Sequence, residues 1–169
     1  MNSASTSTRT YTRTQTAVFL TEVVMGAIAD ILADLRIDLT TLYRDWKQDE
    51  AAIAAWIGEG SLEQVVLECH QPGGTVSPVL EFPVSYRSSG AADPKFTADR
   101  AALARYRAKV DRVPAGTVFR LLCTFSRTPS PQPGWERATR ASTSGLRSLR
   151  FGTLASAPHA SLSMRYLHQ

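Results

Sequence analysis

Thr117-Val-Phe-Arg-Leu-Leu-Cys-Thr-Phe-Ser-Arg127 is the stretch of this chain in which side chains alternate most regularly. One face of the stretch carries Phe119, Leu121, Cys123 and Phe125, and the other carries Val118, Arg120, Leu122, Thr124 and Ser126. Alternation with a period of two, with β-branched and aromatic residues, predicts a strand with one buried face. The residues after Arg127 are rich in Pro, Ser, Thr and Arg. The first question is therefore whether these residues form a disordered C-terminal segment or interact with the edge of this strand.

Other stretches predict further strands. Residues 62–70 and 76–87 also alternate, and the turn signal Gln71-Pro-Gly-Gly74 joins them into a predicted β-hairpin. Pro83 has no backbone N–H, so we expect it at a free edge or at a β-bulge. A second hairpin is predicted at the C-terminus, from a short strand-like run with Leu149, Phe151 and Leu154 and from the alternating residues Leu162, Met164, Tyr166 and His168.

Three segments have the apolar spacing of amphipathic helices. The first begins near Thr12-Arg-Thr-Gln15, whose spacing matches a capping box, and runs to about Arg36. The second covers residues 48–58, after a connecting loop at residues 37–47. The third begins at Asp93-Pro94, a favourable N-cap pair, and runs to about Arg112. Helices packed on one face of an antiparallel sheet make a two-layer α+β domain, which is the fold class we expect.

The composition is that of one globular domain. The chain has 169 residues, of which 43% are hydrophobic and 20% are charged. It contains no uninterrupted apolar run of about eighteen residues, so we expect no membrane span. The polar residues 1–15 do not resemble a secretion signal, so we expect a cytoplasmic protein. In that compartment Cys69 and Cys123 are expected to be reduced core residues.

The charge is unevenly distributed along the chain. The net charge is +4, and from Arg112 onward eight basic residues face a single acidic one, Glu136. A basic C-terminal third suits an acidic partner or a nucleic acid. The alternative function is therefore nucleic-acid binding through Arg137, Arg140, Arg147 and Arg150. Against it, the segment lacks the interleaved aromatic residues on which single-strand binders stack bases.

Catalytic and cofactor motifs are missing. There is no phosphate-binding glycine loop, dinucleotide fingerprint or nucleophile elbow. His70, His159 and His168 lack metal-ligand spacing, and Cys69 points to the opposite face of a strand from its neighbour His70. We expect no enzymatic activity, metal or cofactor, and a small enzyme is the least favoured reading.

The order of these elements, and several residues, resembles the HORMA domain from about Thr12 to His168. Tyr11-Thr-Arg-Thr-Gln15 is similar to the opening of bacterial members. Pro133-Gly-Trp-Glu136 resembles the start of the family's C-terminal "safety belt", and residues 146–154 and 161–167 resemble its terminal hairpin. The second helix is shorter and richer in Ala than in eukaryotic relatives. The resemblance implies a flexible segment at residues 1–12, then a single HORMA domain at 13–169, with a core at 13–127 and a mobile belt at 128–169.

The resemblance also implies a function, that of a switchable peptide-binding adaptor. In the family, the belt and its hairpin occupy one sheet edge in an open state and the opposite edge in a closed state. The freed edge then takes a partner's closure peptide as an added strand. By this resemblance the peptide-binding edge comprises Val118, Phe119, Arg120, Leu121, Leu122, Cys123, Thr124 and Phe125. The belt residues are Trp135, Arg137, Arg140, Leu149, Phe151 and Leu154.

The partners implied are those of bacterial members in CBASS antiphage defence. Such members bind and activate a cGAS/DncV-like nucleotidyltransferase (CD-NTase), which makes a cyclic oligonucleotide. An AAA+ remodelling ATPase reopens them by pulling on the N-terminus, here Ser3, Thr6, Thr8 and Arg9. A second HORMA paralogue would be a further partner. The resemblance leaves open which state predominates and whether this chain binds the synthase directly or through the paralogue.

Overall fold

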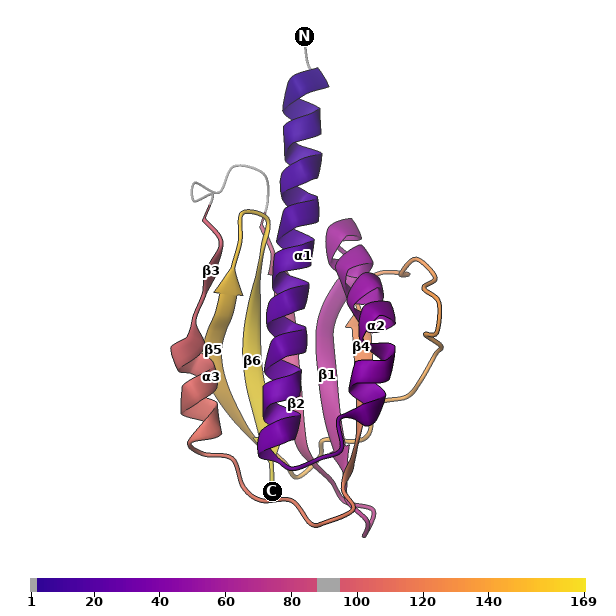
Figure 1. The fold of residues 1–169 in the computed structure, drawn as a ribbon, viewed down its shortest axis with the longest axis vertical. Coiled ribbons are helices and arrows are strands. Elements are labelled where there is room, and N and C mark those ends of the chain that lie inside the picture. The colour runs from indigo at the N-terminus through magenta and orange to yellow at the C-terminus, as the bar shows by residue number, and fades with distance from the viewer. Residues whose placement is uncertain (1–2, 88–94) are drawn as a thin grey trace.

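The computed structural model describes residues 3–87 and 95–169, except for the side chains of residues 3–11. Within that part, three helices lie on one face of a six-stranded sheet (Figure 1). The helices are α1 (Ser3–Asp34), α2 (Thr40–Glu59) and α3 (Arg100–Arg107). The strands are β1 (Leu62–His70), β2 (Val76–Tyr86), β3 (Thr97–Ala98), β4 (Val118–Phe125), β5 (Arg147–Ser156) and β6 (Ala160–His168). The two-layer α+β fold expected from the sequence is confirmed.

β4 and the C-terminal hairpin of β5 and β6 lie on opposite sides of the β1–β2 pair in the sheet. Its strands pair antiparallel in the order β3-β5-β6-β2-β1-β4. β4 is an edge strand and pairs with β1, from Leu62↔Phe125 to His70↔Val118. The hairpin of β5 and β6 pairs with β2 instead. The chain between β4 and β5 must therefore cross from one side of the sheet to the other.

The core lies between α1 and the sheet. Leu20, Val24, Ile28 and Ile31 of α1 are fully buried, as their three- and four-residue spacing predicts. The window of α1 from Thr12 to Asp34 has the length and mean hydropathy (1.8) of a membrane span, but 56% of it is buried inside the domain. The packing against the sheet therefore accounts for its apolar character.

The starts of α1 and α2 differ from the prediction. α1 begins at Ser3, so the capping-box candidate at Thr12 lies inside the helix, whose N-terminal end projects beyond the sheet (Figure 1). α2 begins at Thr40, so most of the predicted loop at residues 37–47 is helical. Its first turn is fixed by Asp38 Oδ1, which accepts hydrogen bonds from the backbone N–H (3.0 Å) and the hydroxyl (2.7 Å) of Thr40. Asp49 falls on the apolar face between Leu42 and Ile53, and this charged residue obscures the helical spacing of the first turns in the sequence.

α3 is shorter than predicted. Asp93-Pro94, the predicted start, lies outside the described residues. The N-cap is Asp99, whose Oδ1 accepts from the backbone N–H groups of Ala101 (2.9 Å) and Ala102 (3.3 Å). The preceding residues Thr97–Ala98 are strand β3, paired with β5. The helix ends at Arg107 rather than near Arg112.

The prediction for Pro83 was wrong. Pro83 lies in β2, between β1 and β6, and is neither at a free edge nor at a bulge. On the β1 side the register is regular from Glu68↔Val79 up to its last pair, Gln64↔Pro83. On the β6 side no pair is formed between Glu81↔Arg165 and Val84↔Leu162. The missing N–H therefore falls where the β2–β6 ladder is interrupted, and the interior strand tolerates the proline.

Candidate functional site

The outer edge of β4 has backbone groups that no strand uses. Ser126 donates its N–H to Ser61 O (3.0 Å) on the β1 side, beside the opposed pair Leu62 and Phe125. Hydrogen-bonding direction alternates along a strand. The N–H and C=O groups that face away from β1 are therefore those of Phe119, Leu121, Cys123 and Phe125. In the described part of the chain β1 is the one strand paired with β4, so this edge can accept another strand.

The side chains of the same four residues form an apolar wall beside that edge. Phe119, Leu121, Cys123 and Phe125 are half-buried and pack on the main core under the helices, as the alternation predicts. Phe125 also packs edge-to-face on Trp56 of α2, with ring centroids 4.8 Å apart. The opposite face is less polar than predicted, because Leu122 is buried there in a second cluster with Val66, Val79 and Leu167.

The belt segment, defined here as residues 128–146, is attached to α2 on the helix face of the sheet. Trp56 Nε1 donates to the carbonyl of Ser130 (2.8 Å). Trp135 packs edge-to-face on Trp56, with ring centroids 5.2 Å apart. Gly134, just before it, has φ +78°, and a Cβ at that position would overlap the side chain of Gln48. The residues Pro133-Gly-Trp135 therefore pack the belt segment closely against α2.

The belt segment is attached again on the helix-free face. Arg120 Nη2 of β4 donates to the carbonyl of Thr139 (2.7 Å). Two residues on, the Ala141 N–H donates to Glu68 Oε1 of β1 (2.8 Å). Arg140 lies between them and pairs with Glu81 of β2 (3.4 Å). The belt therefore passes from one face of the sheet, around the β4 edge, to the other face, and then crosses to β5.

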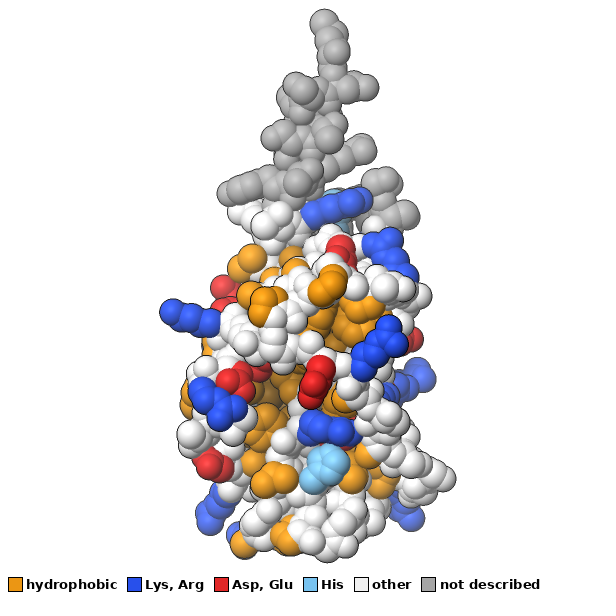
Figure 2. All heavy atoms as spheres, turned by 90° about the vertical axis from the view of Figure 1, so that its right-hand side faces the viewer, with side chains coloured by type: hydrophobic (Ala, Val, Ile, Leu, Met, Phe, Trp, Pro, Cys, Tyr) orange, Lys and Arg blue, Asp and Glu red, His pale blue; other side chains and the backbone are white. Residues whose placement is uncertain are grey.

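A groove lies between the β4 edge and the belt segment. It has a volume of about 710 Å³. Its lining comprises Trp56 of α2, four β4 residues (Leu121, Leu122, Cys123 and Phe125), and belt residues that include Pro129, Pro131 and Trp135. Figure 2, which faces this side of the molecule, shows hydrophobic side chains gathered in hollows among charged ones. The shape and lining suit an extended, largely apolar segment.

The two carboxylates under the belt, Glu68 and Glu81, are buried and paired with arginines. Glu68 is fully buried. Burial opposes its ionisation, but hydrogen bonds from the Ala141 N–H, His70 and Arg120 outweigh this, so its pKa lies below the ordinary 4.5. Glu81 is 4% exposed, and Arg165 of β6 lies 2.8 Å from it.

The structure separates the belt residues singled out in the sequence into two groups. Trp135 and Arg137 line the groove, and Arg140 holds the belt to the sheet. Leu149, Phe151 and Leu154 lie in β5, which pairs with β6 and β3 on the other side of the sheet from β4. The side chains of the proposed remodeller handle, Ser3, Thr6, Thr8 and Arg9, lie outside the described residues.

Sequence reasoning missed three residues of this site. Local pattern does not single out Trp56, Glu68 or Glu81, because each gains its role from the belt segment far along the chain. A carboxylate flanked by apolar residues in a strand, as in Val65-Val-Leu-Glu-Cys69, is the signal that could have found Glu68.

The two cysteines are free thiols, as expected. Burial raises the pKa of Cys69 to about 12 and that of Cys123 further still. Both thiols are therefore protonated at neutral pH. Among the described residues no three His, Cys, Asp or Glu side chains gather as a metal site.

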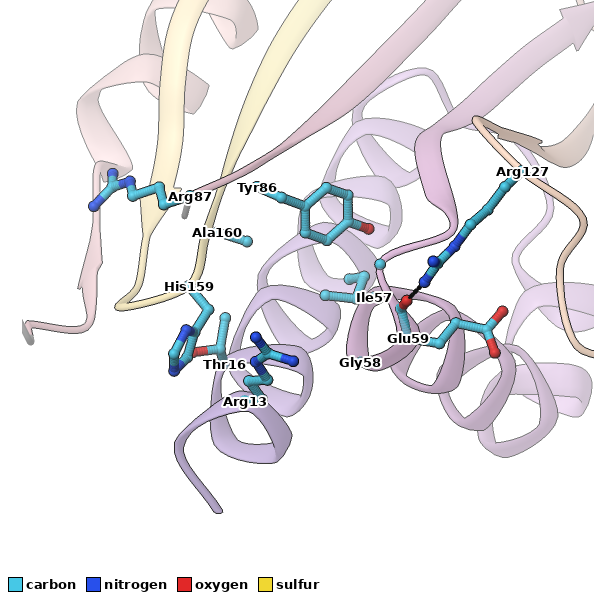
Figure 3. Close-up of a pocket in the computed structure, with 11 residues that line it drawn as sticks. Arg13, Thr16, Ile57, Gly58, Glu59, Tyr86, Arg87, Arg127, His159 and Ala160 are labelled. Carbon is cyan, nitrogen blue, oxygen red and sulfur yellow. Dashed lines mark hydrogen bonds between the residues drawn. The ribbon is translucent and has the colours of Figure 1, made fainter. Parts of the chain in front are cut away.

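A second hollow, of about 280 Å³, lies where α1, the ends of α2 and β2, and the β5–β6 turn meet (Figure 3). Arg13, Arg87 and Arg127 reach it from separate segments. Arg127 donates to the carbonyl of Glu59 at the end of α2, and Arg87 donates to Ser156 Oγ (2.6 Å). Since two of its three arginines bind the chain's own acceptors, we assign this hollow a structural role.

The comparisons with known proteins agree with this geometry. The family model described as Bacterial HORMA domain 2 matches residues 5–169. No curated protein matches the sequence significantly.

Several solved structures are similar, at identities that show the fold alone. One is a chain of the mitotic checkpoint complex (TM-score 0.74, 9% identity, 92% of this chain and 99% of that chain). Another is C. elegans HTP-1 bound to the HIM-3 closure motif (0.70, 11%, 91% and 90%). A third belongs to the E. coli MS115-1 CdnC:HORMA-deltaN complex (0.57, 15%, 90% and 87%).

The family model covers nearly the whole sequence, and the fold and the belt around the β4 edge agree with it. This chain therefore belongs to the bacterial HORMA domain 2 family.

Proposed function

We propose that this protein is a peptide-binding signalling adaptor. A partner's closure peptide adds to β4 as a further strand, and the belt segment holds it there. The observation that carries the proposal is the unpaired edge of β4, enclosed by a segment that is attached to both faces of the sheet. The similar HTP-1 structure holds a closure motif, which supports the same use of the fold here.

The protein is in the closed arrangement and exchanges with an open one. Its hairpin of β5 and β6 pairs with β2, on the side of the sheet away from β4, and β4 is free. In the open arrangement the hairpin would occupy the β4 edge, and the groove would be unavailable to a peptide.

The partner proposed is a cGAS/DncV-like nucleotidyltransferase of antiphage defence in the cytoplasm, which the adaptor activates directly or through a HORMA paralogue. Support comes from the similar E. coli structure, in which a HORMA protein is complexed with CdnC. An AAA+ ATPase would reopen the belt. The N-terminal end of α1, which projects beyond the sheet, is the accessible place to pull (Figure 1).

Replacing Leu121 by proline tests the edge. The Leu121 N–H faces away from β1, so Leu121→Pro removes a docking donor and leaves the β1–β4 ladder intact. A peptide selected from a random display library on the wild-type protein should bind this variant at least tenfold more weakly. Leu121→Ala is the matched control, because it removes the side chain and keeps the N–H. Calorimetric titration measures both, with circular dichroism to verify folding.

Equal losses in the two variants would show that the edge is not the docking site. Failure to select any peptide would contradict the proposed function itself.

The alternative, nucleic-acid binding, has less support in the structure. Arg140 is paired with Glu81. Arg147 and Arg150 are exposed on β5 and form no ion pair within the described residues. If single-stranded nucleic acid bound with steep salt dependence, equally in wild type and Leu121→Pro, this alternative would replace the adaptor proposal.

A further inference from the structure

We infer that Glu68 is a latch: a positioning residue that holds the belt segment closed and so sets how fast a peptide enters and leaves the β4 groove. The peptide part of this inference rests on the proposed function. The latch itself is a property of the free protein.

One carboxylate joins the belt to the docking strand. Glu68 Oε1 accepts the Ala141 N–H of the belt (2.8 Å). Glu68 Oε2 accepts from Arg120 Nη2 (2.9 Å) and Nε (3.2 Å) of β4, and His70 Nε2 lies 2.9 Å from it. Three segments of the chain therefore meet at a side chain that is fully buried.

Arg120 completes a closed network. Its Nη2, besides binding Glu68, donates to the carbonyl of Thr139 (2.7 Å). The belt is thus held at Thr139 by the arginine and at Ala141 by the carboxylate, and Arg120 belongs to the strand that would receive the peptide. Hydrogen bonds to charged groups are stronger than neutral ones, and they also fix direction.

A second carboxylate strengthens the attachment between these two points. Glu81 of β2 is paired with Arg140 of the belt (3.4 Å) and with Arg165 of β6 (2.8 Å). Each carboxylate is satisfied by the belt and by a sheet arginine together. When the belt loosens, Glu68 and Glu81 each lose one partner. A buried carboxylate that loses a partner raises the free energy of the protein until water reaches it.

The enclosure gives this latch a kinetic signature. A short peptide with free ends reaches the edge, and leaves it, only while the belt is loose. Weakening the latch raises the frequency of loosening in both directions. Association and dissociation should therefore speed up together, with little change in Kd. A general loss of structure would instead weaken binding.

The test removes the Ala141 donor without touching the sheet. Proline at this position lacks an N–H, so Ala141→Pro breaks the bond to Glu68, and Ala141→Ser is the control that keeps it. Arg140→Gln removes the Glu81 pair, and Arg147→Gln is its control, an exposed arginine of β5 without an ion pair among the described residues. All four are studied in the full chain.

The first readout needs no ligand. The hydrogen-exchange rate of residues 128–146 should rise about tenfold in Ala141→Pro and Arg140→Gln. A rise of this size corresponds to the free energy lost with one charge-assisted hydrogen bond. Exchange in the buried part of α1 and in both controls should stay unchanged. Unchanged belt exchange in Ala141→Pro, or an equal rise in Ala141→Ser, would overturn the latch.

The second readout uses the library-selected peptide in stopped-flow measurements. The association and dissociation rate constants should both rise by the same factor as belt exchange. Because Kd is their ratio, it should stay within about twofold of the wild-type value. A rise in dissociation alone would overturn the kinetic role of the latch. If wild type bound no selected peptide, the proposed function would fail, and hydrogen exchange alone would decide on the latch.

Discussion

At the scale of residues, the site depends on a few side chains that meet across long sequence separations. The alternation in β4 predicted which side chains face the core, and the family resemblance pointed to Trp135 as a residue of the belt. Its partner Trp56 did not stand out, because a tryptophan on the apolar face of a helix looks like ordinary core. The roles of Glu68 and Glu81 also depend on the path of the belt, which local pattern does not encode.

The partly buried carboxylate of Asp49 in α2 destabilises the folded protein at neutral pH. Burial, and then the charge of Asp45, raise its pKa from 3.8 to about 6. Because the folded-state pKa of Asp49 lies above its ordinary value, the contribution of this one group to stability is fully present below pH 3.8 and is lost as pH rises through about 6. Asp49→Asn should therefore stabilise the protein at about pH 7.5, by the order of 1 kcal/mol once solvent screening is allowed for, and less at about pH 5.

Urea unfolding of Asp49→Asn at the two pH values measures this. Glu50→Gln changes the charge of the same helix equally and serves as the control. The same gain at both pH values, or in both variants, would show that the Asp49 environment is not the cause.

At the scale of elements, strands were easier to predict than helix ends. Period two in β1, β2, β4 and β6 is a strong signal, since the helix-facing side chains of each strand are apolar and pack in the main core. The start of α2 depends on a local bond between Asp38 and Thr40, and the start of α3 depends on Asp99 following a two-residue strand. Such boundaries are decided by single hydrogen bonds and by sheet pairing, neither of which periodicity reports.

The attachment of the belt segment to α2 gives a prediction at this scale. Trp56→Phe keeps an aromatic ring against Phe125 and Trp135 but leaves the Ser130 carbonyl without the indole donor. We expect a loss of about 1 kcal/mol in stability and faster tryptic cleavage after Arg137. Trp46→Phe, on the same helix, should leave the cleavage rate unchanged. Slow cleavage in both variants would mean that the indole bond does not hold the belt.

At the scale of the whole molecule, the sequence predicted two hairpins and one sheet but not their order. Either side of the sheet offers the C-terminal hairpin an antiparallel partner. The choice of β2 buries Leu162, Met164 and Tyr166 in the main core. Deleting residues 135–169 would therefore remove core as well as belt, and it cannot test the belt alone.

A covalent lock is the better test. Ser85 of β2 and Ser161 of β6 are directly opposite each other, so cysteines there can fix the hairpin in place. With the belt anchored at both ends, the oxidised Ser85→Cys/Ser161→Cys protein should bind a short peptide normally. It should fail to capture the same sequence placed between two folded domains until a reductant is added. Surface plasmon resonance of both ligands, with and without reductant, measures this.

Capture of the flanked ligand by the oxidised protein would mean that the belt does not form a closed loop around the edge. The single variants Ser85→Cys and Ser161→Cys, which cannot form this crosslink, control for the substitutions themselves.

The enclosure of the β4 edge also bears on solubility. An exposed strand edge with apolar neighbours is a template on which copies of a protein stack into aggregates. The belt segment leaves room for one strand but obstructs the approach of a whole sheet, whose neighbouring strands and side-chain layers are too wide to fit beneath it. The protein can therefore keep an unpaired strand edge that a single peptide strand can reach, while other copies of the protein cannot stack on it.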